Sequence, residues 1–174
     1  MKHRFAGLLV TLFVTSAFAQ MGPPKPGPEL KKLDYFVGNW DSTGDSKPGP
    51  MGPGGTMTMQ TNAKWMDGGF FVVQNNSFKS PMGDGTGMSL IGYDPQEKVY
   101  TYYEFNSMGE AFQAKGNVDG DTWTWLSDMK MGPQTAKSRF TEKILSPTAY
   151  NFKFEMSMDG TTWNTVMDGK ATKK

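Results

Sequence analysis

The chain has 174 residues, of which 37% are hydrophobic, 13% aromatic and 20% charged, with 21 glycines and 14 methionines. This length fits one domain with a single core, and this composition is typical of a β-rich globular protein rather than a disordered chain or a helical bundle. The formal net charge of +1 becomes −1 when the basic residues of a predicted leader are removed, which argues against a nucleic-acid partner or an anionic membrane surface.

Residues 1–19 have the three parts of a secretory signal peptide. Basic residues lie at positions 2–4, an apolar run follows over 5–14, and Ala17-Phe18-Ala19 is a small-x-small cleavage box. The apolar run is shorter than the roughly 20 residues that span a bilayer. We therefore expect cleavage before Gln20, export to the periplasm or the medium, and no membrane attachment of the mature chain. Because the mature chain has no cysteine, its core alone must stabilise it.

A linker and a short helix precede the predicted domain. Residues 20–28 (QMGPPKPGP) are rich in proline and glycine, a composition that favours neither helix nor sheet. The domain itself is predicted over 29–174. Its first apolar residues recur at spacings of three and four, and they are Leu30, Leu33, Phe36 and Val37. This spacing predicts a short helix with one apolar face, which would plug the end of a core.

The rest of the chain is predicted to be strand, divided by turns such as Asp119-Gly120 and Asp159-Gly160. Sequential hairpins favour an antiparallel up-and-down sheet, and closing such a sheet into a barrel removes its exposed edges. We therefore predict an all-β barrel of about ten strands with the helix as its plug. The predicted strands are 39–45, 56–65, 70–79, 87–93, 99–106, 111–118, 122–129, 134–145, 149–157 and 162–172.

The sequence Gly38-Asn39-Trp40 resembles the Gly-x-Trp opening of lipocalin-like (calycin) barrels. This resemblance implies that a short N-terminal helix closes one barrel end and that the tryptophan packs beneath it. It also implies a basic side chain against that tryptophan, for which Arg139 and Lys170 are the candidates.

Further motifs extend this resemblance over nearly the whole mature chain. In combination they are similar to an uncharacterised bacterial family of small, often secreted, lipocalin-like proteins with a domain of unknown function. That family implies an architecture and no activity. The motifs are Phe36 to Trp40, Pro48 to Gly55, Trp65 to Phe71, Gly92 to Pro95, Lys98 to Tyr103 and Ser146 to Thr148.

Several chemistries are excluded by the residues that the mature chain lacks. The only histidine, His3, lies in the predicted signal peptide, and there is no cysteine. The mature chain therefore cannot form a Ser-His-Asp triad, a Cys-His dyad or an ordinary zinc site. Haem would need a Tyr, Met or Lys ligand in place of the axial histidine that haem-binding small barrels use. We expect no catalytic residues of these kinds, no metal site and no cofactor.

The candidate ligand contacts are aromatic and acidic side chains of the predicted strands. Glu104 shares a face with Tyr102, and Glu142 shares one with Phe140, so either carboxyl can point into the barrel and have its pKa raised by desolvation. A ten-stranded barrel is wide enough to leave interior space, and we expect the loops at 48–55 and 80–87 to cover one mouth. The predicted pocket residues are Trp123, Trp125, Tyr103, Phe105, Phe152, Phe154, Glu104 and Glu142.

Three functions fit these residues. The first is a non-enzymatic exported barrel, monomer or homodimer, that binds a small apolar or amphipathic molecule. The second is a Cu(I) binder whose thioethers lie in pairs on one side of a strand, at Met57-x-Met59, Met129-x-Met131 and Met156-x-Met158. The third is an acid-base enzyme that uses Glu104 and Glu142. The first is preferred because methionine is an adaptable core residue and most inward carboxylates are structural.

Overall fold

The computed structural model describes residues 24–174, so the predicted signal peptide and the first four residues of the predicted linker, 20–23, lie outside the described residues. The described chain forms one short helix and ten strands. Within it no helix is long and apolar enough to cross a lipid bilayer. The elements are η1 (Pro28–Phe36), β1 (Gly38–Ser46), β2 (Gly55–Trp65), β3 (Val72–Ser80), β4 (Gly83–Asp94), β5 (Val99–Asn106), β6 (Ala111–Asp119), β7 (Thr122–Met131), β8 (Gln134–Ser146), β9 (Ala149–Ser157) and β10 (Asn164–Lys173).

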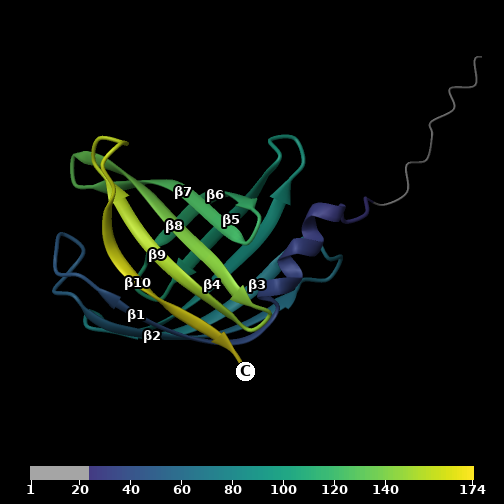
Figure 1. Cartoon of the computed structure of the whole chain (residues 1–174), viewed down its shortest axis with the longest axis horizontal. Helices are drawn as coiled ribbons and strands as arrows, with labels where there is room; N and C mark the ends of the chain where they lie inside the picture. The colour runs from purple at the N-terminus through teal and green to yellow at the C-terminus, as the bar shows by residue number, and fades with distance from the viewer. Residues whose placement is uncertain (1–23) are drawn as a thin grey trace, which may run out of the picture.

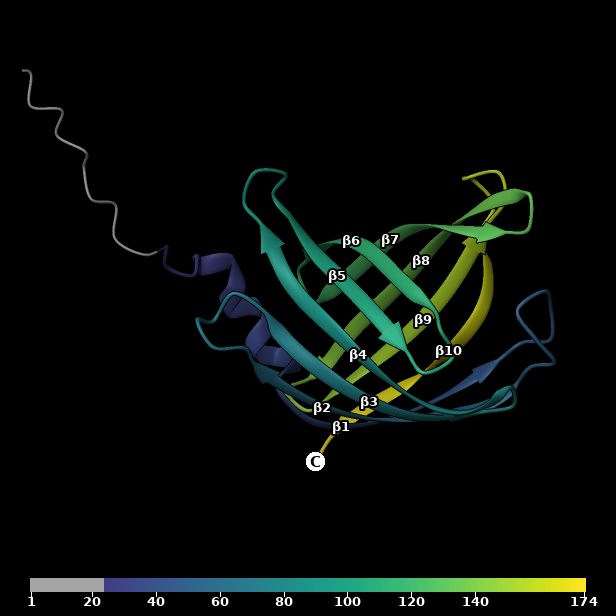
Figure 2. The same cartoon turned by 180° about the vertical axis from the view of Figure 1, so that it is seen from behind.

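The ten strands form a closed antiparallel barrel (Figure 1). Each strand pairs with its neighbours in the chain, and β1 closes the ring by pairing with both β2 and β10. The view from behind shows the same continuous wall, with the helix at one end (Figure 2). The prediction of an all-β up-and-down barrel of about ten strands with a short N-terminal helix is confirmed.

Three strands, β3, β4 and β10, begin two or more residues away from their predicted first residues. β4 begins at Gly83 rather than at residue 87, because the glycine-rich run from 83 to 87 pairs with the end of β3, where Ser80 is opposite Gly83. The loop predicted over 80–87 is therefore a tight turn at residues 81 and 82. β3 begins at Val72, two residues later than predicted.

The helix η1 is a 3-10 helix, which has three residues per turn. Its buried residues, Leu30, Leu33 and Phe36, are three apart and so lie along one face. Val37, which the sequence analysis placed on that face, follows the helix in an extended conformation. Gly38 then has a φ of 127°, a value that L side chains rarely adopt, and this turn directs the chain into β1.

Tryptophans of the first two strands hold the helix over one end of the barrel. The indole nitrogen Nε1 of Trp40 in β1 donates to the backbone oxygen of Phe36 at 2.8 Å. That of Trp65 in β2 donates to Oδ1 of Asp34, also at 2.8 Å. The expectation that the first-strand tryptophan packs beneath the helix is therefore confirmed.

Tyrosines hold the helix to the other strands of the same rim. The hydroxyl of Tyr100 in β5 donates to the backbone oxygen of Glu29 at 2.9 Å. Tyr35 of the helix contacts the backbone oxygens of Ser146 at 3.1 Å and Ala149 at 3.0 Å, where β8 turns into β9. The helix is thus attached on several sides of the barrel and closes this end.

The cation against Trp40 is Lys173 and neither of the two predicted residues. Lys173 is directly opposite Trp40 in the β1–β10 pairing, and its Nζ lies 4.9 Å from the indole centroid. Arg139 lies elsewhere, with its guanidinium carbon 4.2 Å from the ring centroid of Trp163. Which basic residue lies beside Trp40 depends on strand register, and the sequence pattern does not specify that register.

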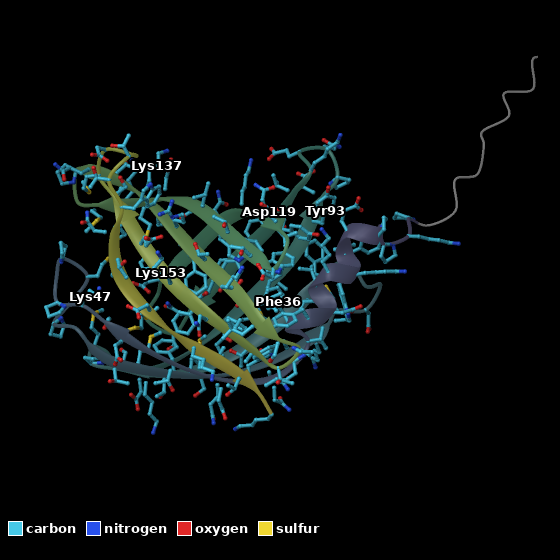
Figure 3. The ribbon with its side chains drawn as sticks, in the orientation of Figure 1. Phe36, Lys47, Tyr93, Asp119, Lys137 and Lys153 are labelled. Atoms are coloured by element: carbon cyan, nitrogen blue, oxygen red, sulfur yellow. The ribbon has the colours of Figure 1, made fainter. Side chains whose placement is uncertain are left out.

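The barrel is filled at the helix end. Leu33 and Val72 are wholly buried there. The ring of Phe36 meets that of Trp123 edge-on with 5.2 Å between centroids, and Trp123 lies 4.6 Å from Tyr100. Phe36 therefore marks the closed end of the barrel in Figure 3, where Lys47 lies at the opposite end.

Candidate ligand-binding cavity

A cavity of about 420 Å³ occupies the half of the barrel away from the helix. Phe36 and Trp40, which contact each other beneath the helix, contribute to its closed end. The loop between β1 and β2, the turn at residues 81 and 82, and Met108 after β5 also line it. In an up-and-down barrel these connections all lie at the end opposite the helix, so that end is the mouth. The volume lies within the range of roughly 300 to 1,000 Å³ that is typical of small-molecule sites.

Aromatic rings of the cavity wall lie against glycines of neighbouring strands. Gly116 is opposite Trp125 in the β6–β7 pairing, and a Cβ atom there would lie 2.3 Å from the indole. Gly169 is opposite Phe152 in the β9–β10 pairing, and a Cβ atom there would lie 2.5 Å from the phenyl ring. A larger residue at either glycine would push the ring away from the wall. The glycines therefore keep the interior space open.

One buried carboxyl, Glu142 of β8, lines the cavity. Its residue is only 8% exposed, and its Oε2 accepts a hydrogen bond of 2.9 Å from Nε1 of Trp125. Burial raises the pKa of Glu142 from its ordinary 4.5 to about 7, although the indole hydrogen bond partly opposes the shift. The carboxyl therefore titrates near neutral pH rather than in the acid range of an exposed glutamate.

A second carboxyl, Glu104 of β5, lines the cavity nearer its mouth, where Glu110 also contributes. The hydroxyl of Tyr102 donates to Oε2 of Glu104. Burial raises the pKa of Glu104, the Tyr102 hydrogen bond lowers it, and the charge of Glu110 adds a smaller increase. Burial and the adjacent Glu104 charge hold the pKa of Tyr102 well above its ordinary value, so this hydroxyl stays a donor.

The structure brings five of the eight predicted pocket residues together around the cavity. They are Trp125, Phe152, Phe154, Glu104 and Glu142. All five alternate inward along β5, β7, β8 and β9, as the period of two in a strand requires. Whether they contact a ligand stays a prediction.

The other three predicted residues do not line the cavity. Tyr103 and Phe105 are 40% and 51% exposed on the outer surface, so the interpretation that placed them in the pocket is wrong. Their neighbour Glu104 points inward, and adjacent residues of a strand point to opposite faces. Trp123 points inward, but it lies in the filled core beneath the helix, where it packs against Phe36 and Tyr100.

Further cavity residues were missed although the sequence contained a signal for some of them. Tyr102 shares a strand face with Glu104, and Phe140 shares one with Glu142, so alternation alone identifies both as inward. The first four strands contain no predicted pocket residue from which alternation could identify the inward face. The aromatic residues of the cavity outside the eight predicted pocket residues are Phe36, Trp40, Phe78, Tyr102, Phe112, Phe140 and Tyr150.

The structure places the three predicted methionine pairs differently. Met57 and Met59 both line the cavity. Met129 and Met131 lie on one strand, β7, but are not among the cavity residues. The third pair is wrong as predicted, because β9 ends at Ser157 and Met158 lies beyond it, 56% exposed. Over residues 24–174, no three His, Cys, Asp or Glu side chains come close enough together to hold a metal ion.

Comparison with known proteins identifies the family but no activity. Among solved structures, the crystal structure of Rv2717c from M. tuberculosis aligns with a TM-score of 0.58 at 10% sequence identity, over 86% of this chain and 99% of that chain. At this identity the likeness shows a shared fold alone. No curated protein matches. Residues 25–173, which include every strand of the barrel, match the family described as "Protein of unknown function (DUF1579)", and the chain therefore belongs to the DUF1579 family.

Proposed function

We propose that this DUF1579 protein binds a small apolar or amphipathic molecule in the barrel cavity and does not catalyse a reaction. The observation that carries the proposal is an open cavity of about 420 Å³ lined by aromatic rings and a few polar groups. Sites for small molecules have this combination of apolar walls and sparse, fixed polar groups. Residues 1–19 add the expectation that binding takes place after export.

The cavity wall carries polar groups among its apolar side chains, which favours an amphipathic ligand. On β2 to β4, a hydrogen bond of 2.8 Å joins Thr61 to Asn76, and another of 3.1 Å joins Asn76 to Ser89. Trp125 of β7 and Phe152 of β9 also line the cavity, and Glu142 lies on β8 between these two strands. An apolar body packed on the rings removes aromatic surface from water, while a polar group of the wall can hydrogen-bond a head group.

Filling the cavity should abolish binding. The probe is N-phenyl-1-naphthylamine, an uncharged dye whose fluorescence rises in apolar surroundings. We expect saturable binding at one site in the wild type and roughly tenfold weaker binding in Met59→Trp, because the new ring occupies the cavity. The matched control is Met88→Trp, whose side chain lies on the outer surface and should leave the affinity unchanged. Equal affinity in both variants, or no saturable signal from folded wild type, would contradict the proposal.

The burial of Glu142 should appear in the pH dependence of stability. Between its unfolded pKa of 4.5 and its folded value of about 7, the folded chain binds more protons than the unfolded chain, so this group's stabilisation is lost as pH rises. Glu142→Gln lacks the titration. From about pH 5 to pH 8, we expect the free energy of unfolding of wild type to fall by roughly 2 to 3 kcal/mol relative to this variant. Urea titrations followed by tryptophan fluorescence measure it, and parallel pH profiles would show that the carboxyl is not buried.

A second candidate function is Cu(I) binding. It is favoured by the distribution of methionines, since Met57 and Met59 lie in the cavity together with Met51, Met82, Met108 and Met167. Thioethers are the soft ligands that Cu(I) prefers. This candidate and the first one use the same space but different atoms.

Paired leucine substitutions separate the two candidates. If copper is the ligand, Met57→Leu/Met59→Leu should bind Cu(I) at least about tenfold more weakly than wild type in competition with bicinchoninic acid. The matched control, Met129→Leu/Met131→Leu, removes two thioethers that are not among the cavity residues and should behave as wild type. Equal Cu(I) affinity in all three proteins would exclude a cavity copper site and leave the binding of an organic molecule.

A further inference from the structure

The charges that line the cavity are unbalanced. Three of the charged lining residues are acidic, Glu104, Glu110 and Glu142, and one is basic, Lys47. Lys47 lies in the loop at the mouth, at the far end of the barrel from Phe36 (Figure 3). Every ion pair among the described side chains lies elsewhere and involves neither Glu104 nor Glu142. The interior is therefore acidic and has no counter-charge of its own.

Glu142 in particular is surrounded by neutral groups. Burial raises the pKa of Tyr35 from the helix, of Tyr102 from β5 and of Tyr150 from β9, and the charge of Glu142 adds a smaller increase to each, so these phenols are uncharged at neutral pH. Among residues 24–174 the Trp125 indole is the one hydrogen-bond partner of the carboxyl, and it contacts Oε2, which leaves Oε1 for a ligand. An ionised carboxylate in such surroundings is costly unless a positive charge lies beside it.

The aromatic groups around Glu142 are also suited to a cation. Phe152 is opposite Glu142 in the β8–β9 pairing, and Phe140 stacks on Phe152 with 5.7 Å between ring centroids. Trp125 completes this group by its hydrogen bond to the carboxyl. Ring faces attract cations within about 6 Å of their centroids. A carboxylate and three aromatic rings at one place thus provide both a counter-ion and a cation–π environment.

We infer that the ligand of the cavity is an amphipathic organic cation, an amine with an apolar or aromatic body, whose ammonium group pairs with Glu142 and whose body packs on the aromatic wall. This inference rests on the proposed function, since it names the ligand class of the same cavity. At mildly acidic pH a proton neutralises Glu142 in the empty cavity. When the ammonium binds, that proton leaves to solvent, so one positive charge replaces another. An anionic amphiphile would instead place its carboxylate beside Glu104 and Glu142.

Three compounds that differ only in their head groups test the charge preference. They are 4-phenylbutylamine, 4-phenyl-1-butanol and 4-phenylbutanoate, and the amine stays cationic below about pH 9 because alkyl amines titrate near pH 10. Calorimetric titration at about pH 8 should give at least tenfold tighter binding for the amine than for the alcohol, and the weakest binding for the acid. The affinity of the amine should rise between about pH 5.5 and pH 8, while that of the alcohol stays constant.

Proton release gives a second readout. At about pH 6, calorimetry in two buffers of different ionisation enthalpy should show that the amine displaces close to one proton and that the alcohol displaces none. Glu142→Gln should reduce the amine affinity to that of the alcohol and abolish proton release. Glu97→Gln, which removes an exposed carboxylate that pairs with Lys115 outside the cavity, should preserve both. If Glu142→Gln does not fold, the number of protons that the wild type releases on binding the amine tests the inference.

The outcomes separate this inference from the proposed function. If all three compounds bind with equal affinity and no proton is released, the cation preference is wrong, while the cavity remains a binding site. If the acid binds most tightly, the preference is also wrong, and Lys47 at the mouth becomes the group that selects the ligand. If none of the three binds folded protein, both the inference and the proposed function are contradicted.

Discussion

The attachment of one short helix across one end of the barrel is the constraint on which the rest of the structure depends. Hydrogen bonds from Trp40, Trp65 and Tyr100, contributed by three different strands, fix η1 there. Leu33 and Phe36 then fill the space beneath it. A barrel of ten strands is wider than its interior side chains can fill. The remaining space therefore lies at the end away from the helix. The helix thereby decides where the cavity lies and which loops surround its mouth.

The chemistry of the cavity follows from contacts within its wall. Glycines opposite Trp125 and Phe152 let these rings lie against the strands, so aromatic residues line the space instead of filling it. The indole of Trp125 in turn holds the carboxyl of Glu142, which no described cation neutralises. Open volume, aromatic surface and an acidic interior are thus consequences of one arrangement of β6 to β10.

Strand alternation predicted most of the fold and part of the candidate site. The period of two identified Phe152, Phe154 and Glu142 as inward, and the same rule, applied around Glu104, excludes Tyr103 and Phe105. Trp123 and Trp125 share a strand face, yet one lies in the filled core and the other in the cavity wall. That difference depends on how far the helix reaches into the barrel. The position of Lys173 beside Trp40 likewise depends on strand register, which no local pattern specifies.

A crystal soaked with bromobenzene tests the central claim, that the barrel contains an open aromatic cavity away from the helix. Anomalous scattering from bromine locates the compound without reference to any assumed binding mode. The account predicts a peak inside the barrel, beside Trp125 and Phe152 and on the mouth side of Phe36. The contradictory result is a barrel with no interior peak, in which the rings of Phe140, Phe152 and Trp125 have left the wall and filled the space.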